Sequence, residues 1–180
     1  MNAGLQHKLV NVNSVLVGRT AVGYQAWDGL RSIDFLLSRD EVDATLPIGM
    51  TGNSGGGAQT MYLMALDDRI GPAAPSCHIT TLERNFELGS AGDGCQSPPL
   101  TGAEGIDHPD FFAMRAPKPS IILAAEQDFK DIRFTRETYQ EASAVFNMLD
   151  VPDRVALFVY NDGHTFSQPR REEAGRWRRR

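Results

Sequence analysis

A G-x-S-x-G pattern is the chemically most specific feature of the sequence. It runs from Gly52 to Gly56 and places Ser54 at its centre. An apolar run, Leu46–Met50, precedes it and an apolar stretch, Ala58–Leu66, follows it. A serine at a sharp turn between a buried strand and a helix is exposed as a nucleophile, and the flanking glycines remove Cβ atoms that would crowd the turn. The pattern therefore predicts Ser54 as a nucleophile.

A serine hydroxyl is a weak nucleophile until a base activates it, and the base needs an acid that orients it. Asp128 comes shortly after the apolar run Ser120–Ala125, and His164 comes shortly after the expected strand 154–160. Parallel sheets carry their sites at the carboxyl ends of the strands, so these side chains are predicted to meet as acid and base. The amide of Gly55, at the start of the following helix, is expected to bind the oxyanion.

Each of these assignments has a structural alternative. Ser54 also suits a helix N-cap in a glycine-rich turn. Glu126 and Asp131 are alternatives to Asp128 as the acid, because they are close to it in the sequence. His164 also suits a purely structural place in a turn, since Gly163 precedes it.

No metal or organic cofactor is expected from the remaining polar residues. The segment 107–110, Asp-His-Pro-Asp, resembles a metal cluster only superficially. Cys77 and Cys95 are too few for a disulfide framework or a four-cysteine zinc site, although one bridge is an alternative. We interpret Cys77 as a small buried residue and Cys95 as a loop thiol. The other histidines are interpreted as structural or exposed: His7, His78 and His108.

Nucleotides and nucleic acids are not the expected partners. A P-loop requires a lysine after its last glycine, but Ala58 follows Gly57. A dinucleotide-binding turn requires glycine where Ser54 stands, so that the backbone can approach the pyrophosphate. The net charge of −5 argues against nucleic acid as the main partner.

The chain has no predicted membrane span. Its longest wholly apolar run, Val155–Tyr160, has six residues, whereas a spanning helix needs about 20. Residues 1–14 lack the charged start and apolar block of a secretory signal, so a cytoplasmic location is expected. We interpret the arginine-rich segment 167–180 as a solvated last helix with Ala174 and Trp177 facing inward, rather than as a phosphate-binding or membrane-binding tail.

Continuous apolar strands that alternate with helices predict an α/β fold with a mostly parallel sheet covered by helices on both faces. We expect one domain over residues 1–180, with the glycine- and proline-rich segment 81–118 as a lid-like or substrate-facing excursion. The expected strands are 46–50, 70–77, 120–125 and 154–160. The expected helices are 21–39, 58–66, 110–115, 136–149 and a last helix that Ser167 caps.

Six stretches carry a resemblance to a known superfamily: TGNSGGGAQT (51–60), LDDRI (66–70), AAPSCHIT (73–80), HPDFFAMRAPKPSIIL (108–123), AAEQDF (124–129) and DGHTFS (162–167). With them the chain resembles the α/β-hydrolase superfamily, especially acetyl xylan esterase-like proteins near the dienelactone hydrolases. The resemblance implies Ser54 as nucleophile, His164 as general base and acid, and Asp128 as its orienter. It implies a carboxylic ester hydrolase that forms an acyl-enzyme, with acetylated carbohydrate or other small esters as substrates.

The chain departs from this superfamily ahead of the nucleophile. Only 53 residues precede Ser54, so we expect the first strands and the second oxyanion-hole amide to be absent from it. A sheet of four or five strands would then present an exposed edge that invites pairing with a second copy. Two alternatives to the esterase stay open: a prolyl-oligopeptidase-type serine peptidase, and an inactive hydrolase fold that serves as a binding or subunit domain.

Overall fold

The structure is a computed structural model that describes residues 3–88, 94–96, 98 and 101–177. Its residue contacts group the chain into two compact units. One comprises Met1–Leu46 with Leu82–Ile106, and the other comprises Pro47–Thr81 with Asp107–Arg180. The single domain expected from the sequence stays a prediction.

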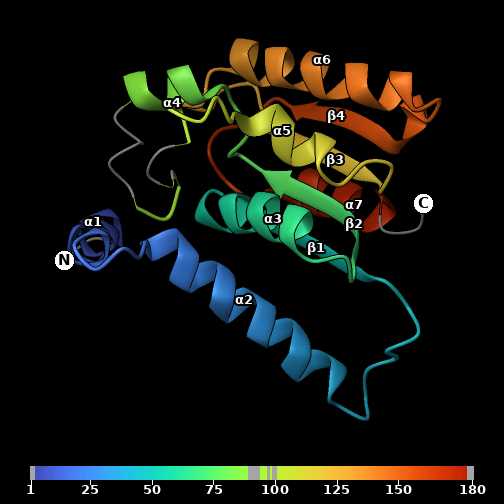
Figure 1. Cartoon of the computed structure of the whole chain (residues 1–180). Coiled ribbons are helices and arrows are strands. Elements are labelled where there is room, and N and C mark those ends of the chain that lie inside the picture. Colours follow the sequence, from blue (N-terminus) through green and yellow to red (C-terminus); the bar gives the residue numbers. More distant parts are fainter. Residues whose placement is uncertain (1–2, 89–93, 97, 99–100, 178–180) are drawn as a thin grey trace. The chain divides into compact units, whose positions relative to one another are not determined.

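The second unit is built on a parallel sheet (Figure 1). Its described part has four strands in the order β1 (Ile48–Asn53), β2 (Ile70–Ser76), β3 (Ser120–Ala125) and β4 (Val155–Tyr160). All three neighbouring pairs are parallel, and β3 and β4 keep an unbroken register from their first residues to their last. The mostly parallel sheet predicted from the sequence is confirmed.

Helices pack against both faces of this sheet. On one side α3 (Gly55–Leu66) packs on β1 and β2, α6 (Ile132–Met148) packs on β3 and β4, and α5 (His108–Ala113) contacts both helices. On the other side α7 (Gln168–Trp177) packs against β2, β3 and β4, and Figure 1 shows it behind the sheet. The layered α/β class is therefore confirmed.

The boundaries differ from the sequence-based expectation where local chemistry moves them. Strand β1 ends later than expected, and α3 begins at Gly55, because the glycine-rich segment forms the first turn of the helix. Helix α6 begins earlier than expected because the Asp131 side chain accepts a hydrogen bond from the Arg133 amide at 3.0 Å and caps it. One short 3₁₀ turn, η2 (Pro152–Arg154), leads into β4.

The last helix, α7, agrees only in part with the solvated helix that the sequence predicted. Ala174 and Trp177 are buried and pack with Ile121 and Leu123 of β3, as the sequence predicted. Arg170, in contrast, is 0% exposed rather than solvated. Its guanidinium is enclosed because the loop that precedes the helix folds over it, as described below.

A second buried cation lies at the amino ends of the strands. Arg115 donates to the carbonyl oxygens of Pro119 at 2.8 Å and of Met64 at 3.2 Å, and also to that of Gly71. Burial lowers its pKa to about 10. These bonds join α3, β2 and the entry to β3, and the sequence offered no signal for them because the partners are backbone atoms far apart in the chain.

The first unit contains α1 (Ala3–Val15), α2 (Ala21–Leu37) and α4 (Leu82–Glu87). Helix α2 was predicted, whereas α1 and α4 were not. The Asn11 side chain accepts a hydrogen bond from the Ala21 amide at 3.0 Å and joins α1 to α2. Thr20 caps α2 by accepting from the Gly23 amide at 2.9 Å. No helix in the described part of the chain is both long enough and apolar enough to cross a membrane.

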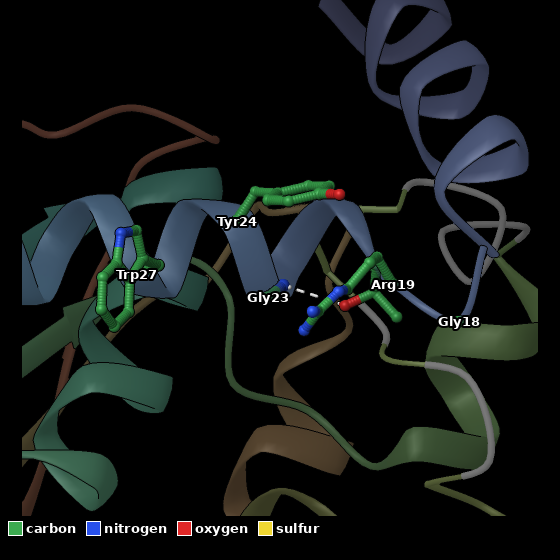
Figure 2. A pocket seen from close by; sticks show the side chains of 6 residues that line it. Gly18, Arg19, Gly23, Tyr24 and Trp27 are labelled. Carbon is green, nitrogen blue, oxygen red and sulfur yellow. Dashed lines mark hydrogen bonds between the residues drawn. The ribbon is translucent and has the colours of Figure 1, made fainter.

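The start of α2 borders a pocket of about 470 Å³ (Figure 2). Trp27 is 58% exposed beside this pocket, and the Arg31 guanidinium lies 4.6 Å from its ring centre. Tyr24 is exposed there as well. The residues that line the pocket are Gly18, Arg19, Thr20, Gly23, Tyr24 and Trp27.

The predicted excursion 81–118 contains α4 and α5, and its residues 89–93, 97 and 99–100 lie outside the described part of the chain. Phe112 is fully buried. Phe111 meets the ring of Tyr62 edge-on at 5.2 Å. The role of the excursion at a substrate site stays a prediction.

Candidate active site

Ser54 occupies a strained turn between β1 and α3. Its backbone angles are φ 57° and ψ −116°, which a residue with a side chain rarely adopts. Its amide donates to the carbonyl of Ser76 on the neighbouring strand at 2.9 Å, which fixes the turn to β2. The side chain makes no capping hydrogen bond to the helix. The hydroxyl is therefore not engaged as an N-cap, which was the structural alternative.

The turn is tight because two glycines allow the backbone to approach itself. A Cβ atom on Gly52 would lie 2.5 Å from the Gly56 carbonyl oxygen, and one on Gly57 would lie 2.4 Å from that of Ser76. A Cβ atom on Gly56 would meet nothing within 4 Å. The expected need for glycine at Gly56 is therefore wrong, and Gly57 is the position behind Ser54 that must lack a side chain.

Gly55, the predicted oxyanion donor, is the first residue of α3. The first amides of a helix have no acceptor within the helix, and they lie at the positive end of its dipole. Its amide thus has the chemistry that an oxyanion requires. Its role, and the identity of a second donor, stay predictions.

Asp128 and His164 meet because the β3–β4 ladder continues beyond both strands. The Glu126 amide donates to the Tyr160 carbonyl and the Gln127 amide to the Asp162 carbonyl, each at 2.9 Å. The two loops therefore leave the sheet side by side. His164 Nδ1 lies 2.8 Å from Asp128 Oδ1 and 3.0 Å from Oδ2.

The environment of Asp128 suits a carboxylate. Its side chain is only 2% exposed, and it also accepts a hydrogen bond from the Lys130 amide at 3.0 Å. Burial, the largest single influence, opposes ionisation, but the hydrogen bonds from His164, Lys130 and Cys77 together hold the pKa of Asp128 below its ordinary value. Of the alternative acids, Asp131 caps α6 and pairs with Arg133.

The loop that carries His164 is held by the buried guanidinium of Arg170. This group donates to the carbonyls on both sides of His164, those of Gly163 at 3.0 Å and of Thr165, and it pairs with Asp162 at 3.1 Å. The His164 side chain remains 25% exposed. Phe129 packs on the imidazole, with the ring centres 4.4 Å apart.

Cys77 lies against the acid and the histidine, which sequence reasoning did not foresee. It follows β2 directly, has φ 51°, and is 4% exposed. Burial, followed by the hydrogen bond to Asp128, raises the pKa of its thiol to about 12. The sequence did offer a topological signal, because Cys77 follows its strand as Asp128 and His164 follow theirs.

The other polar residues weighed in the sequence have structural places. Asp107 and Asp110 form the capping box of α5, which accounts for their spacing. His108 accepts from the Thr80 amide at 3.2 Å, and His78 stacks on it with ring centres 5.0 Å apart. Burial lowers the pKa of His108 to about 3 and that of His78 well below its ordinary value, so both rings are neutral.

Known proteins resemble this chain in structure. No family model and no curated protein matches its sequence. The solved methylesterase BT1017 is 25% identical with a TM-score of 0.68, and the match covers 86% of this chain and 34% of that one. A glucuronoyl esterase from Solibacter usitatus is 19% identical with a TM-score of 0.72, covering 89% of this chain and 48% of the other. A glucuronoyl esterase from Caldicellulosiruptor kristjansonii is 15% identical with a TM-score of 0.75, covering 89% of this chain and 50% of the other.

The likeness confirms the α/β-hydrolase fold that the sequence resemblance implied. The chain spans about a third to a half of the length of these three esterases.

Two glycines that follow the Ser54 turn, Gly56 and Gly57, give a matched test of the backbone crowding. Gly57→Ala is expected to lower the free energy of unfolding by about 1–3 kcal/mol, because its methyl group collides with the Ser76 carbonyl. Gly56→Ala is expected to leave it unchanged or to raise it by up to about 1 kcal/mol, because the site is open. Urea unfolding of both variants measures the difference. Equal effects would contradict the described packing.

Arg170→Met is expected to destabilise the protein by about 3 kcal/mol or more, because it leaves Asp162 and two carbonyl groups without their buried donor. The control is Arg176→Met on the same helix, whose side chain is exposed and whose ion pairs contribute little. Thermal or urea unfolding compares the two. A loss in the control as large as in Arg170→Met would show that the loop does not depend on Arg170.

Proposed function

We propose that this chain is the core of a carboxylic ester hydrolase in which Ser54, His164 and Asp128 act as a catalytic triad. The observation that carries the proposal is the hydrogen bond between His164 Nδ1 and the buried Asp128 carboxylate. It lies at the carboxyl end of the parallel sheet, where β1 also ends in the strained turn of Ser54. An acid that holds one nitrogen of an imidazole leaves the other nitrogen as a base.

The reaction proceeds through an acyl-enzyme. Ser54 Oγ attacks the ester carbonyl while His164 Nε2 takes its proton and then passes it to the leaving alcohol. Asp128 keeps the remaining proton on Nδ1 and stabilises the imidazolium that forms. The Gly55 amide donates to the oxyanion. Water, activated by His164, then releases the acid and restores the serine. None of these steps requires a metal or an organic cofactor.

We further propose that the substrate is a small carbohydrate ester. Support comes from the structural relatives, whose names describe a methylesterase and glucuronoyl esterases. Two chemical classes are to be compared, because the sequence resemblance implies acetylated carbohydrate whereas the relatives' names indicate esters of sugar acids. Assays with acetylated xylan and with the methyl ester of glucuronic acid separate them, with p-nitrophenyl acetate as a general ester and a prolyl anilide as the peptidase control. Hydrolysis of the anilide alone would contradict the esterase proposal.

Pairing of a second copy through the sheet stays a prediction. In the described part of the chain β1 and β4 are the two edge strands, and β1 pairs with β2 alone. An open edge offers unpaired backbone groups to another strand. Light scattering over a range of concentrations measures whether copies associate.

Ser54→Ala is expected to lower kcat for p-nitrophenyl acetate by a factor of about 10⁴–10⁶, because no other group replaces the nucleophile. Folding should persist, as judged by circular dichroism. Ser32→Ala, on α2, is the control, since its hydroxyl donates to the Asp28 carbonyl one helical turn earlier. Activity above a tenth of the original in Ser54→Ala would remove Ser54 from the mechanism.

Asp128→Asn is expected to lower kcat by a factor of about 10⁴, because an amide permits the wrong tautomer of His164. Asp131→Asn should retain most of the activity, since Asp131 serves α6. Steady-state kinetics on one ester compares the two variants. The assignment of the acid fails if Asp131→Asn or Glu126→Gln is the damaging change.

A further inference from the structure

Three metal-binding side chains converge on one point beside the proposed base. The ligand atoms of Cys77, Asp128 and His164 all lie within 4.8 Å of one another. They come from three different segments, which follow β2, β3 and β4 respectively. Such convergence is a property of the sheet, because parallel strands end at a common edge.

The chemistry of this set matches a particular class of cation. A thiolate and an imidazole are preferred ligands of zinc and of softer divalent ions, and one carboxylate oxygen commonly joins them. A thiolate and a carboxylate together carry two negative charges, which a divalent cation neutralises. Neutrality matters here because Cys77 and the Asp128 side chain are almost completely buried.

A buried histidine outside this group of three lies beside two of its members. A cavity of about 10 Å³ is lined by Cys77, His78 and Asp128 and also by the buried cation Lys130, among other residues. His78 is 1% exposed, and neither of its ring nitrogens has a hydrogen-bond partner in the described part of the chain.

We infer that Cys77, Asp128 and His164 form a binding site for a thiophilic divalent cation such as Zn²⁺ or Cd²⁺, and that its occupancy switches off ester hydrolysis. The inhibitory part of this inference rests on the proposed function, whereas the binding part does not. The site differs from a catalytic metal centre, because the cation blocks the triad rather than taking part in the reaction.

Binding replaces one proton and moves another. The cation displaces the proton of the Cys77 thiol, which leaves to water. Neutral His164 keeps its single proton but carries it on Nε2, so that the lone pair of Nδ1 binds the cation in place of the hydrogen bond to Asp128. A protonated Nε2 has no lone pair with which to accept the proton of Ser54. Cation binding and the general-base form of His164 therefore exclude each other.

Two features of the surroundings bear on access and charge. Among the three ligands the His164 side chain is the most exposed, at 25%, so the cation enters from its side. Arg170 donates a hydrogen bond to the Cys77 sulfur, and this bond also favours the thiolate form of the cysteine. The charge of Arg170 is already paired with Asp162. The guanidinium therefore stabilises the ligand form of the cysteine while its own charge is offset.

The direct test is a titration of the purified chain with Cd²⁺, followed by the thiolate-to-metal charge-transfer absorption in the ultraviolet. We expect one cation per chain in the original protein and in Cys95→Ser, which removes the other cysteine of the sequence. The absorption should be absent in Cys77→Ser. Its persistence in Cys77→Ser, or its loss in Cys95→Ser, would overturn the site.

Asp128→Asn gives a second variant in case Cys77→Ser does not fold. It keeps the thiol but removes the carboxylate, and it should bind Cd²⁺ at least about tenfold more weakly in the same titration. Unchanged affinity in this variant would overturn the three-residue site. Circular dichroism establishes that each variant is folded before it is titrated.

The inhibitory arm uses the original protein with Zn²⁺ and p-nitrophenyl acetate. Activity should fall in proportion to occupancy and return when EDTA removes the cation. Full activity at saturating Zn²⁺ would overturn the inhibitory part. A chain that hydrolyses no ester but gives the Cys77-dependent Cd²⁺ absorption would contradict the proposed function and leave the binding site intact.

Discussion

The lack of room for side chains where β1 turns into α3 is the constraint on which the rest of the candidate site depends. Gly52 lies against the backbone of Gly56, and Gly57 lies against Ser76 of the next strand. These two approaches hold the end of β1, the start of α3 and the end of β2 together. The strained backbone of Ser54 persists because its neighbours leave it no relaxed alternative, and the strain presents its side chain at the carboxyl edge of the sheet.

The other half of the site depends on an uninterrupted ladder. Strands β3 and β4 stay in register over their whole length, and two further backbone hydrogen bonds extend the pairing into the loops that carry Asp128 and His164. Arg170 then closes the second loop from within by binding the carbonyls on both sides of the histidine. The placement of Asp128 and His164 therefore follows from backbone pairing and one buried cation. The convergence of the strand ends also brings Cys77 close to Asp128 and His164.

Short-range patterns carried most of what could be predicted from the sequence. Apolar runs identified the four strands of the described residues, and Ser54, Asp128 and His164 were assigned from their positions after such runs. What the sequence did not reveal depends on partners that are distant in the chain. The need for glycine at position 57 arises from Ser76, and the burial of Arg170 arises from carbonyl groups, which leave no trace in residue types. The thiol that meets the acid was predictable only as a buried residue, because its neighbours come from two other strands.

The central claim is that Ser54 is a nucleophile activated by His164. The most direct measurement is reaction of the protein with a fluorophosphonate probe, followed by mass spectrometry of its peptides. We expect one label per chain, on the peptide that contains Ser54, with labelling at least about a hundredfold slower in His164→Ala because the base is gone. An unlabelled protein, or a label on another serine at an equal rate in His164→Ala, would contradict it.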